Sequence, residues 1–150
     1  LVVAIIKTIN DLERIGDQAE KLGRNQLELI DDDAGSSHCM KLEHLGNLVS
    51  KMLNKALDSF ARMDVDEALK TIGLDEKINA EFDGMMRQLI THMMEDPRTI
   101  RNALRVSWCA RALERIGDHS KNICEHVVFL VRGKDVRHIG LKEQVEMVSE

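Results

Sequence analysis

Apolar residues recur along most of the chain at spacings of three, four and seven, which is the period of an amphipathic helix. The first such stripe begins at the start of the sequence without a capping residue before it, so the pattern predicts that the sequence starts within a helix. We expect this first helix to cover residues 1–30. Its predicted core-facing residues are Val2, Ile5, Leu12, Ile15, Ala19, Leu22 and Leu29.

An acidic stretch without periodicity, Asp31 to Ser37, follows the first helix. Its composition predicts a solvated linker, with a calcium-binding loop as the alternative. A second helix is expected over residues 41–61, because apolar residues again follow the helical period there. Its predicted core residues are Leu45, Leu48, Met52, Ala56 and Phe60.

A single third helix is predicted after Asp64, whose side chain suits the N-cap position. Glu67 stands three residues later and completes an aspartate version of the capping box. The pair Asp96-Pro97 closes the following turn, because aspartate suits a cap and proline suits the first helical position. The predicted core residues of the third helix are Leu69, Ile72, Ile78, Phe82, Met86, Leu89 and Met93.

The fourth predicted helix is the longest and the most regular, and Gly133 stands where a C-terminal glycine usually ends a helix. One face keeps an apolar seam through three heptads, and a neighbouring face carries a small residue every seven positions. Two other helices can therefore pack closely against it, as a three-helix bundle requires. The seam consists of Val106, Cys109, Leu113, Ile116, Ser120, Ile123, Val127 and Leu130, and the small face of Ala103, Ala110, Gly117 and Cys124.

Composition supports an all-α fold and excludes several classes of function. Among the 150 residues tyrosine is absent and proline occurs once, which favours helices over sheets. The net charge of −5 argues against broad binding to nucleic acid or anionic lipid. No apolar stretch reaches the ~20 residues that span a bilayer, and no signal peptide is recognisable. Because Cys39, Cys109 and Cys124 lack a CxxC spacing, we expect no disulfide framework and a cytoplasmic location.

The hexapeptide Leu-Glu-Arg-Ile-Gly-Asp occurs twice in the chain, at Leu12–Asp17 and at Leu113–Asp118. The two copies lie 101 residues apart, and the same offset superimposes apolar residues of the first helix on apolar residues of the fourth. The sequence therefore predicts two equivalent helices that carry the same acidic motif.

Carboxylates in the second copy of the hexapeptide have a spacing that suits a metal site. Glu114 and Asp118 are four residues apart, so they lie one turn apart on the same helix face. Asp75 and Asn79 repeat this spacing on the third helix, and Gly117 would let a neighbour approach closely. A bundle that joins the two rows could hold a hard or borderline cation. The alternative is a set of surface ion pairs with neighbouring arginine and lysine residues.

Enzyme signatures are missing from the sequence. A ferritin-type di-iron site needs Glu-x-x-His on two helices, and this pattern does not occur. No glycine-rich phosphate loop or nucleophile elbow is present. His119 is expected at a rim or in an ion pair, and Trp108 in core or boundary packing. The other histidines are expected to be ordinary surface or boundary residues, namely His38, His44, His92, His126 and His138.

Three segments carry a family resemblance, namely Ala110–Ile123, Asn10–Asp17 and Asp75–Asn79. They resemble the PhoU family of phosphate-uptake regulators, over nearly the full length of the chain. The resemblance implies tandem three-helix bundles, each with a Glu/Asp-x-x-x-Asp motif on its third helix that can bind metal ions. The expected organisation is the last helix of a truncated first repeat (1–30), a linker (31–40), a complete second repeat (41–133) and a C-terminal tail (134–150).

The resemblance also implies a function. Members of the family act as cytoplasmic negative regulators of the phosphate-starvation response and link the phosphate ABC transporter to a sensor histidine kinase. We therefore expect a non-enzymatic regulator that contacts these proteins, without nucleic acid as a partner and without direct membrane insertion. One complete bundle leaves the apolar stripe of the first helix uncovered, so we expect this helix either to dock on the chain's own bundle as a fourth helix or to pair with the first helix of another chain in a twofold homodimer, which is the arrangement we favour. The alternative to a regulatory function is that of a metal-dependent carboxylate-bundle enzyme or a metal-storage protein.

The resemblance assigns metal binding to the acidic motifs. The ion is expected to be iron, zinc, manganese or magnesium, and no organic cofactor is expected. In the first repeat Lys21 stands where the second repeat has Asn122, which weakens the case for the first site. The predicted ligands are Asp75, Asn79, Glu114, Asp118 and Asn122, with Glu13 and Asp17 as weaker candidates.

Overall fold

A computed structural model describes residues 1–31, 36–133, 140, 142, 143, 145 and 146, and the side chains of residues 30–40 are outside this description. The described chain contains helices and no strand, which confirms the predicted all-α fold. None of the described helices combines the length and the apolarity that crossing a bilayer requires. In chain order the elements are α1 (Val2–Asp31), α2 (Ser36–Arg62), α3 (Val65–Ile72), α4 (Leu74–Glu95), the short 3-10 helix η1 (Pro97–Thr99) and α5 (Ile100–Arg132).

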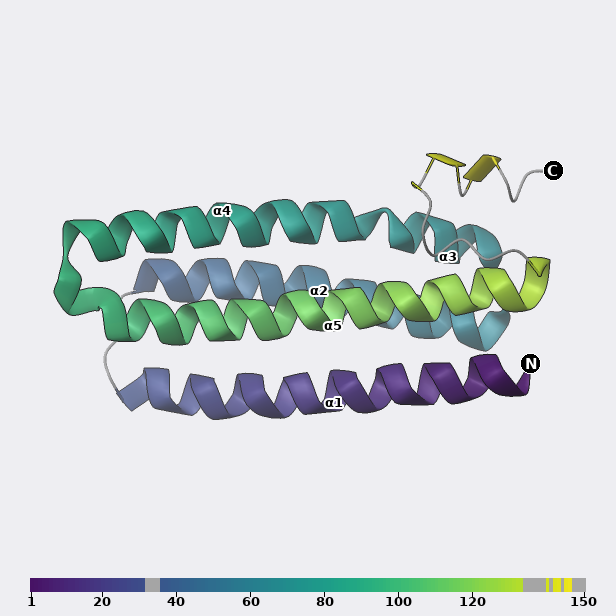
Figure 1. Cartoon of the computed structure of the whole chain (residues 1–150), viewed down its shortest axis with the longest axis horizontal. Coiled ribbons are helices and arrows are strands. Elements are labelled where there is room, and N and C mark those ends of the chain that lie inside the picture. Colours follow the sequence, from purple (N-terminus) through teal and green to yellow (C-terminus); the bar gives the residue numbers. More distant parts are fainter. Residues whose placement is uncertain (32–35, 134–139, 141, 144, 147–150) are drawn as a thin grey trace.

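Helix α5 is the central element of the bundle. It contacts α1, α2, α3 and α4, and its contact with α1 extends along most of both helices. Figure 1 shows that α1 and α5 run antiparallel, so the N-terminal end of α1 lies beside the C-terminal end of α5. Helices α3 and α4 lie on the opposite side of α5 from α1. Helix α1 therefore docks on the chain's own bundle, mainly against α5, which is one of the two arrangements expected from the sequence.

The predicted third helix is divided in two at Gly73, which corrects the single helix expected from the sequence. Glycine has a poor helix propensity, and the N–H of Gly73 closes the last turn of α3 by donating to the carbonyl of Leu69 at 3.3 Å. The predicted cap is confirmed, because Asp64 accepts a hydrogen bond from the N–H of Glu67 at 3.0 Å. The Glu67 carboxylate, however, pairs with Lys55 rather than completing the capping box.

Helix α2 begins earlier than predicted. It starts at Ser36 rather than at residue 41, and α1 extends to Asp31, so the predicted linker over residues 31–40 is partly helical. Serine and small residues suggest a loop by composition, yet serine is also well tolerated near the start of a helix. The calcium-loop alternative concerns residues 32–35 in the main, which lie outside the described part of the chain.

The seam predicted for α5 forms the core, as expected. Its residues from Val106 to Val127 are buried, and Ile123 has no exposed surface. Gly133 adopts a left-handed conformation with a φ of 68°, and its N–H donates to the carbonyl of Phe129 at 2.9 Å. This is the predicted glycine stop at the C-terminal end of the helix.

The small face of α5 brings α4 close to it. Gly117 is buried, and a Cβ atom placed on it would lie 3.5 Å from both Cδ1 and Cγ2 of Ile78 on α4. The close approach predicted for Gly117 is therefore made by an apolar neighbour. This close approach places α4 beside the part of α5 that carries Glu114 and Asp118.

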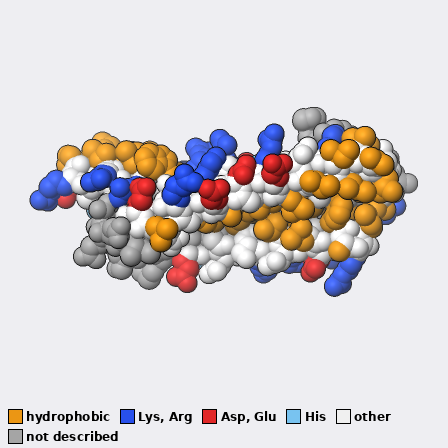
Figure 2. All heavy atoms as spheres, turned by 90° about the horizontal axis from the view of Figure 1, so that it is seen from below, with side chains coloured by type: hydrophobic (Ala, Val, Ile, Leu, Met, Phe, Trp, Pro, Cys, Tyr) orange, Lys and Arg blue, Asp and Glu red, His pale blue; other side chains and the backbone are white. Residues whose placement is uncertain are grey.

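Helix α1 packs on α5 through a different face from the predicted one. Ile15 and Leu29 are buried as expected, but Val2 is 68% exposed and Ile5 and Leu12 are each 39% exposed. Figure 2, seen from the side of α1, shows hydrophobic side chains gathered at its N-terminal end. Periodicity alone selects the most apolar stripe, whereas the face against α5 is partly polar. The buried residues of α1 are Ala4, Thr8, Asp11, Ile15, Gln18 and Leu29.

Candidate functional site

A buried carboxylate joins α1 to α5 through three polar contacts. Asp11 on α1 is 8% exposed and His126 on α5 is 7% exposed. The Oδ1 atom of Asp11 lies 2.9 Å from Nδ1 of His119 and accepts a hydrogen bond from Nδ2 of Asn122 at 3.1 Å. The Oδ2 atom of Asp11 lies 3.0 Å from Nε2 of His126. We call these four residues the Asp11 cluster.

The Asp11 cluster compensates the burial of a negative charge. Burial by itself raises the pKa of Asp11, but hydrogen bonds from the other three members lower the pKa, and the net result lies below the ordinary value. Both carboxylate oxygens therefore have partners, and the ionised form is favoured. This cluster is a buried polar contact in the interface of α1 with α5.

The structure corrects one histidine prediction and confirms another. His126 is expected from the sequence to be a surface or boundary residue, and this prediction is wrong because His126 is buried against Asp11. His119 is predicted at a rim or in an ion pair, and this prediction fits its half-buried position with Nδ1 2.9 Å from the Asp11 carboxylate, a contact that is an ion pair when the imidazole is protonated. The two histidines share one face of α5, but their partner precedes them by 108 and 115 residues. Spacing within one helix cannot reveal such a partner.

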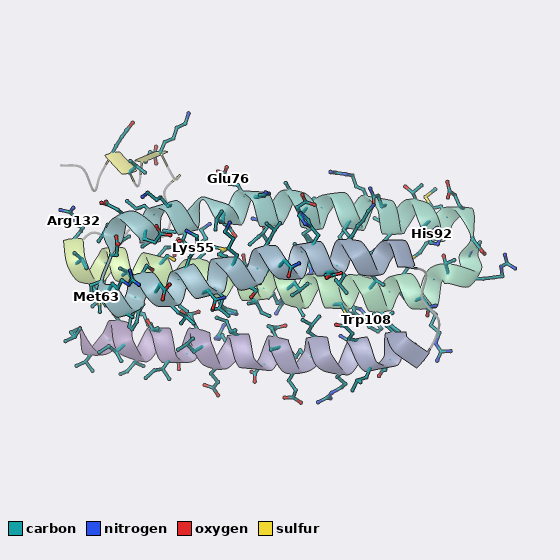
Figure 3. The ribbon with its side chains drawn as sticks, turned by 180° about the vertical axis from the view of Figure 1, so that it is seen from behind. Lys55, Met63, Glu76, His92, Trp108 and Arg132 are labelled. Atoms are coloured by element: carbon teal, nitrogen blue, oxygen red, sulfur yellow. The ribbon has the colours of Figure 1, made fainter. Side chains whose placement is uncertain are left out.

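Trp108 and the other described histidines are more exposed than His126. His44 is exposed and His92 is half-buried, as predicted, and His38 and His138 lie outside the described side chains. Trp108 is 53% exposed, which corrects its predicted place in core or boundary packing. It lies on the part of α5 that runs alongside α1 (Figure 3).

Two of the predicted metal ligands, Asp75 and Asn79, are in contact on α4. Asp75 is buried, and its Oδ2 atom accepts hydrogen bonds from Nζ of Lys121 at 2.9 Å and from Nδ2 of Asn79 at 3.4 Å. Its Oδ1 atom is buried and has no hydrogen-bond partner among the described residues. Lys121 therefore neutralises one oxygen of Asp75, while the other oxygen remains unsatisfied.

Glu114 and Asp118 place two further carboxylates near Asp75. The pKa of Asp118 is raised above its ordinary value, first by burial and then by the negative charges of Glu114 and Asp75. Glu114 lies 3.6 Å from the guanidinium of Arg111, so the ion-pair alternative applies to this residue. A groove of about 640 Å³ crosses this face of α5, and it is lined by Arg14, Arg111, Glu114, Arg115, Asp118, His119, Lys121, Asn122 and Glu125.

These contacts fit a metal site only in part. A bound cation would satisfy the free oxygen of Asp75 and relieve the repulsion around Asp118. Asn122, however, donates to the Asp11 cluster, and Glu13 and Asp17 are exposed on α1. No group of three or more His, Cys, Asp or Glu side chains within the described ranges is arranged to hold a metal ion. Metal binding by the predicted ligands therefore stays a prediction.

Replacing Asp118 with asparagine is expected to stabilise the metal-free chain by about 0.5–1 kcal/mol at neutral pH, because the side chain is partly solvated. The raised pKa of Asp118 means that its ionised form weakens the folded state. The gain should therefore shrink as the pH falls through the folded pKa towards the unfolded value of about 3.9. Thermal unfolding in a chelator at neutral and acidic pH measures both effects. A variant that melts below the parent chain at neutral pH would contradict the proposed repulsion.

Comparison with protein families adds an independent finding to this geometry. The PhoU domain model matches residues 42–127 of the chain. The phosphate-specific transport system accessory protein PhoU homolog of Pseudomonas aeruginosa is 47% identical, over 97% of this chain and 62% of that protein. The accessory protein PhoU of Escherichia coli K12 is 48% identical, over 99% of this chain and 61% of that protein. The chain thus spans about three fifths of the length of these relatives.

Solved structures show the same similarity in three dimensions. The crystal structure of PhoU from Pseudomonas aeruginosa matches with a TM-score of 0.86 and 44% identity, over 89% of this chain and 64% of that chain. The phosphate transport system regulatory protein PhoU from Streptococcus pneumoniae matches with a TM-score of 0.81 and 28% identity, over 90% of this chain and 63% of that chain. The helices α1 to α5 therefore pack on one another much as the helices of these two experimentally determined proteins do.

Proposed function

Since this chain belongs to the PhoU domain family, we propose that it takes part in the control of phosphate uptake, as a negative regulator of the phosphate-starvation response. The observation that carries the proposal is the 47% and 48% identity to two accessory proteins of phosphate-specific transport, over 97% and 99% of the chain. This coverage includes both copies of the hexapeptide and both helices of the Asp11 cluster. The named role of these relatives supports a regulatory rather than an enzymatic function.

The proposed partners are the phosphate ABC transporter and its sensor histidine kinase, contacted on the cytoplasmic side of the membrane. The relatives' description as accessory proteins of a phosphate-specific transport system supports the transporter as a partner. A helical bundle offers long outer faces for such contacts, and this does not require a catalytic centre. A homodimer remains part of the proposal, as the sequence pattern of α1 predicts.

The proposed contacts can be tested by affinity capture. The chain is expected to retain the phosphate transporter and the sensor kinase from detergent-solubilised membranes, and the amounts should differ between cells grown in high and low phosphate. A chain with a disrupted core, such as Ile123→Ala, serves as a folding control. Equal capture by the parent chain and by beads without protein, under both growth conditions, would contradict the proposed partners.

Metal binding at the carboxylates of α4 and α5 is the second part of the proposal, and a metal-dependent enzyme or storage protein is the competing function. The unsatisfied Oδ1 atom of Asp75 supports a cation at this place. Iron, zinc, manganese and magnesium are the ions proposed, because carboxylate oxygens bind hard and borderline cations. An oxidase and hydrolase screen of the metal-loaded chain distinguishes the regulator from the enzyme, since a regulator holds metal without turnover.

Replacing Glu114 with glutamine is expected to abolish the stabilisation that metal confers. A metal that binds only the folded chain raises its stability by about 2.7 kcal/mol when the free ion is about 100 times its Kd. Without metal the same substitution should cost less than about 1 kcal/mol, because Glu114 is half-exposed and Arg111 is its one ion-pair partner among the described residues. Thermal unfolding with manganese, zinc or chelator measures the difference. Equal metal-induced shifts in both chains would remove Glu114 from the ligand set.

A further inference from the structure

The repeated helices α1 and α5 meet in an antiparallel register. Asp11 contacts Asn122, and nearer the other end the carbonyl of Glu28 accepts a hydrogen bond from Arg105 at 3.2 Å. Residue numbers therefore rise on α1 while they fall on α5, as Figure 1 also shows. The hexapeptide repeat relates the two helices by an offset of 101 residues. If α1 and α5 are exchanged at this offset, each pair of facing residues in one half of their interface corresponds to a second pair of facing residues in the other half.

This exchange gives the Asp11 cluster a counterpart that lacks the carboxylate. At the same offset of 101 residues, Asp11 corresponds to Ala112. The three members of the cluster on α5 correspond to Gln18, Lys21 and Asn25 on α1. All four counterparts line one groove of about 460 Å³ between α1 and α5, which we call the Ala112 groove. The repeat and the cavity therefore point independently to the same place.

The lining of the Ala112 groove is positively charged. Lys21 and Arg24 contribute from α1, and Arg111 and Arg115 contribute from α5, whereas no Asp or Glu is among its described lining residues. The chain as a whole has a net charge of −5, so this groove runs against the overall balance. Figure 2 shows Lys and Arg side chains gathered toward the C-terminal half of α1. Arg24 pairs with Glu20 and Arg111 pairs with Glu114, so the uncompensated positive charge of the groove comes from Lys21 and Arg115.

Several donors in the groove lack the acceptor that their counterparts have. Lys21 and Arg115 form no ion pair within the described part of the chain. Gln18 is 8% exposed, yet its side-chain amide makes no hydrogen bond to a described residue. Its counterpart His119 contacts the carboxylate of Asp11 at 2.9 Å. The Ala112 groove thus contains the donors of a carboxylate site without the carboxylate.

We propose that the Ala112 groove binds a small oxyanion, inorganic phosphate, in the place that corresponds to the Asp11 carboxylate. Two unpaired cations favour a dianion over a single carboxylate. The planar guanidinium of Arg115 suits bidentate recognition of phosphate oxygens, and the amides of Gln18 and Asn25 supply neutral donors. Ala112 is buried at the base of the groove with 3% exposure, so the walls of α1 and α5 define a site for a compact ligand.

Phosphate binding by the Ala112 groove is a property beyond the proposed contacts with the transporter and the kinase. Binding is measured on the purified chain, without the transporter or the kinase. If the chain does not bind phosphate, the capture experiment still tests the proposed membrane partners. If those partners are not captured, the measured phosphate affinity still stands.

Trp108 provides the readout, because it lines the groove, is 53% exposed and is the single tryptophan of the chain. Titration with inorganic phosphate at constant ionic strength is expected to change the Trp108 fluorescence and to saturate in the millimolar range, with matching heats in calorimetry. Sodium chloride at the same ionic strength should produce no saturable change. Acetate should bind more weakly than phosphate, because it carries a single charge.

Three substitutions test the place of binding. Ala112→Asp supplies the carboxylate that the repeat lacks here, so it should raise the melting temperature and weaken phosphate binding by more than about tenfold. Lys21→Gln and Arg115→Gln each remove one charged donor and should weaken binding about tenfold. Both of these residues are exposed, so the variants keep the test decisive if the Ala112 variant fails to fold. Circular dichroism verifies the fold of each variant.

The matched control is Arg14→Gln, since Arg14 corresponds to Arg115 in the half of the interface that Asp11 already occupies. Its phosphate affinity should stay within about twofold of the parent chain, because solvent and salt screen the remaining charge effect. A response that never saturates, or an affinity unchanged in all three groove variants, would overturn the proposal. Binding of a glutamate-rich peptide without binding of phosphate would overturn it as well, and would assign the groove to an acidic segment of a protein partner.

Discussion

Replacing Ile123 with alanine is expected to lower the free energy of unfolding by about 3–5 kcal/mol. Ile123 has no exposed surface, and it lies on α5, which contacts every other α-helix of the described chain. The lost methyl and methylene groups would leave a cavity between several helices, and a close-packed bundle can collapse around it only in part. Urea unfolding followed by circular dichroism measures the change.

The matched control for this experiment is Ile90→Ala on α4. Ile90 is 49% exposed, so the same chemical change should alter stability by less than about 1 kcal/mol. Similar losses in the two variants would contradict the central position of α5 in the core.

Replacing Asp11 with alanine is expected to destabilise the docking of α1 on α5 by about 2–4 kcal/mol. The substitution leaves His126 buried and His119 and Asn122 half-buried without their shared acceptor, and the alanine cannot fill the space. Amide hydrogen exchange, resolved by peptide, should show a larger increase in α1 than in α5. Chemical unfolding gives the accompanying change in overall stability.

Asp17→Ala is the control on the same helix, because Asp17 is exposed and outside the Asp11 cluster. Its effect is expected to stay within about 0.5 kcal/mol. Asp11→Asn should fall between the two, since an amide keeps one acceptor oxygen but loses the charge. Unchanged exchange of α1 in the Asp11→Ala chain would mean that apolar contacts alone hold this helix.

Periodicity predicts the parts of the fold in which one strong signal decides the outcome. The seam of α5, the glycine stop at Gly133 and the cap at Asp64 all follow local rules of helix geometry, and the structure contains all three. The same rules could also have predicted the division at Gly73, because a glycine inside an apolar pattern weakens a helix. A continuous apolar stripe across it nevertheless favours one helix over two.

The buried face of α1 could not be derived in this way. Its most apolar positions, among them Val2 and Ile5, remain exposed, whereas Asp11 and Gln18 are buried. A hydropathy pattern assigns polar residues to the surface, and it contains no information on partners that satisfy them from another helix. The Asp11 cluster depends on such partners, more than 100 residues away in sequence. Tertiary register, rather than local pattern, decides which face of α1 is covered.

The carboxylates of the predicted metal site are an intermediate case. Four-residue spacing predicts that Asp75 and Asn79 share one helix face, and the two side chains are hydrogen-bonded at 3.4 Å. The negative charges of Glu114 and Asp75 contribute to the raised pKa of Asp118. Spacing does not predict that Lys121 donates to Asp75 or that Asn122 faces α1. Both contacts join residues of different helices, so they depend on tertiary packing rather than on spacing within one helix.

The contacts between α1 and α5 also bear on the order in which the chain folds. Asp11 precedes its partners on α5 by 108 to 115 positions, so bringing them together closes a far longer loop than a hairpin of neighbouring helices does. Helices α4 and α5 adjoin each other through η1 and can associate early, because their contacts are local. We therefore expect α1 to dock last during folding, on a bundle that α2 to α5 have already formed.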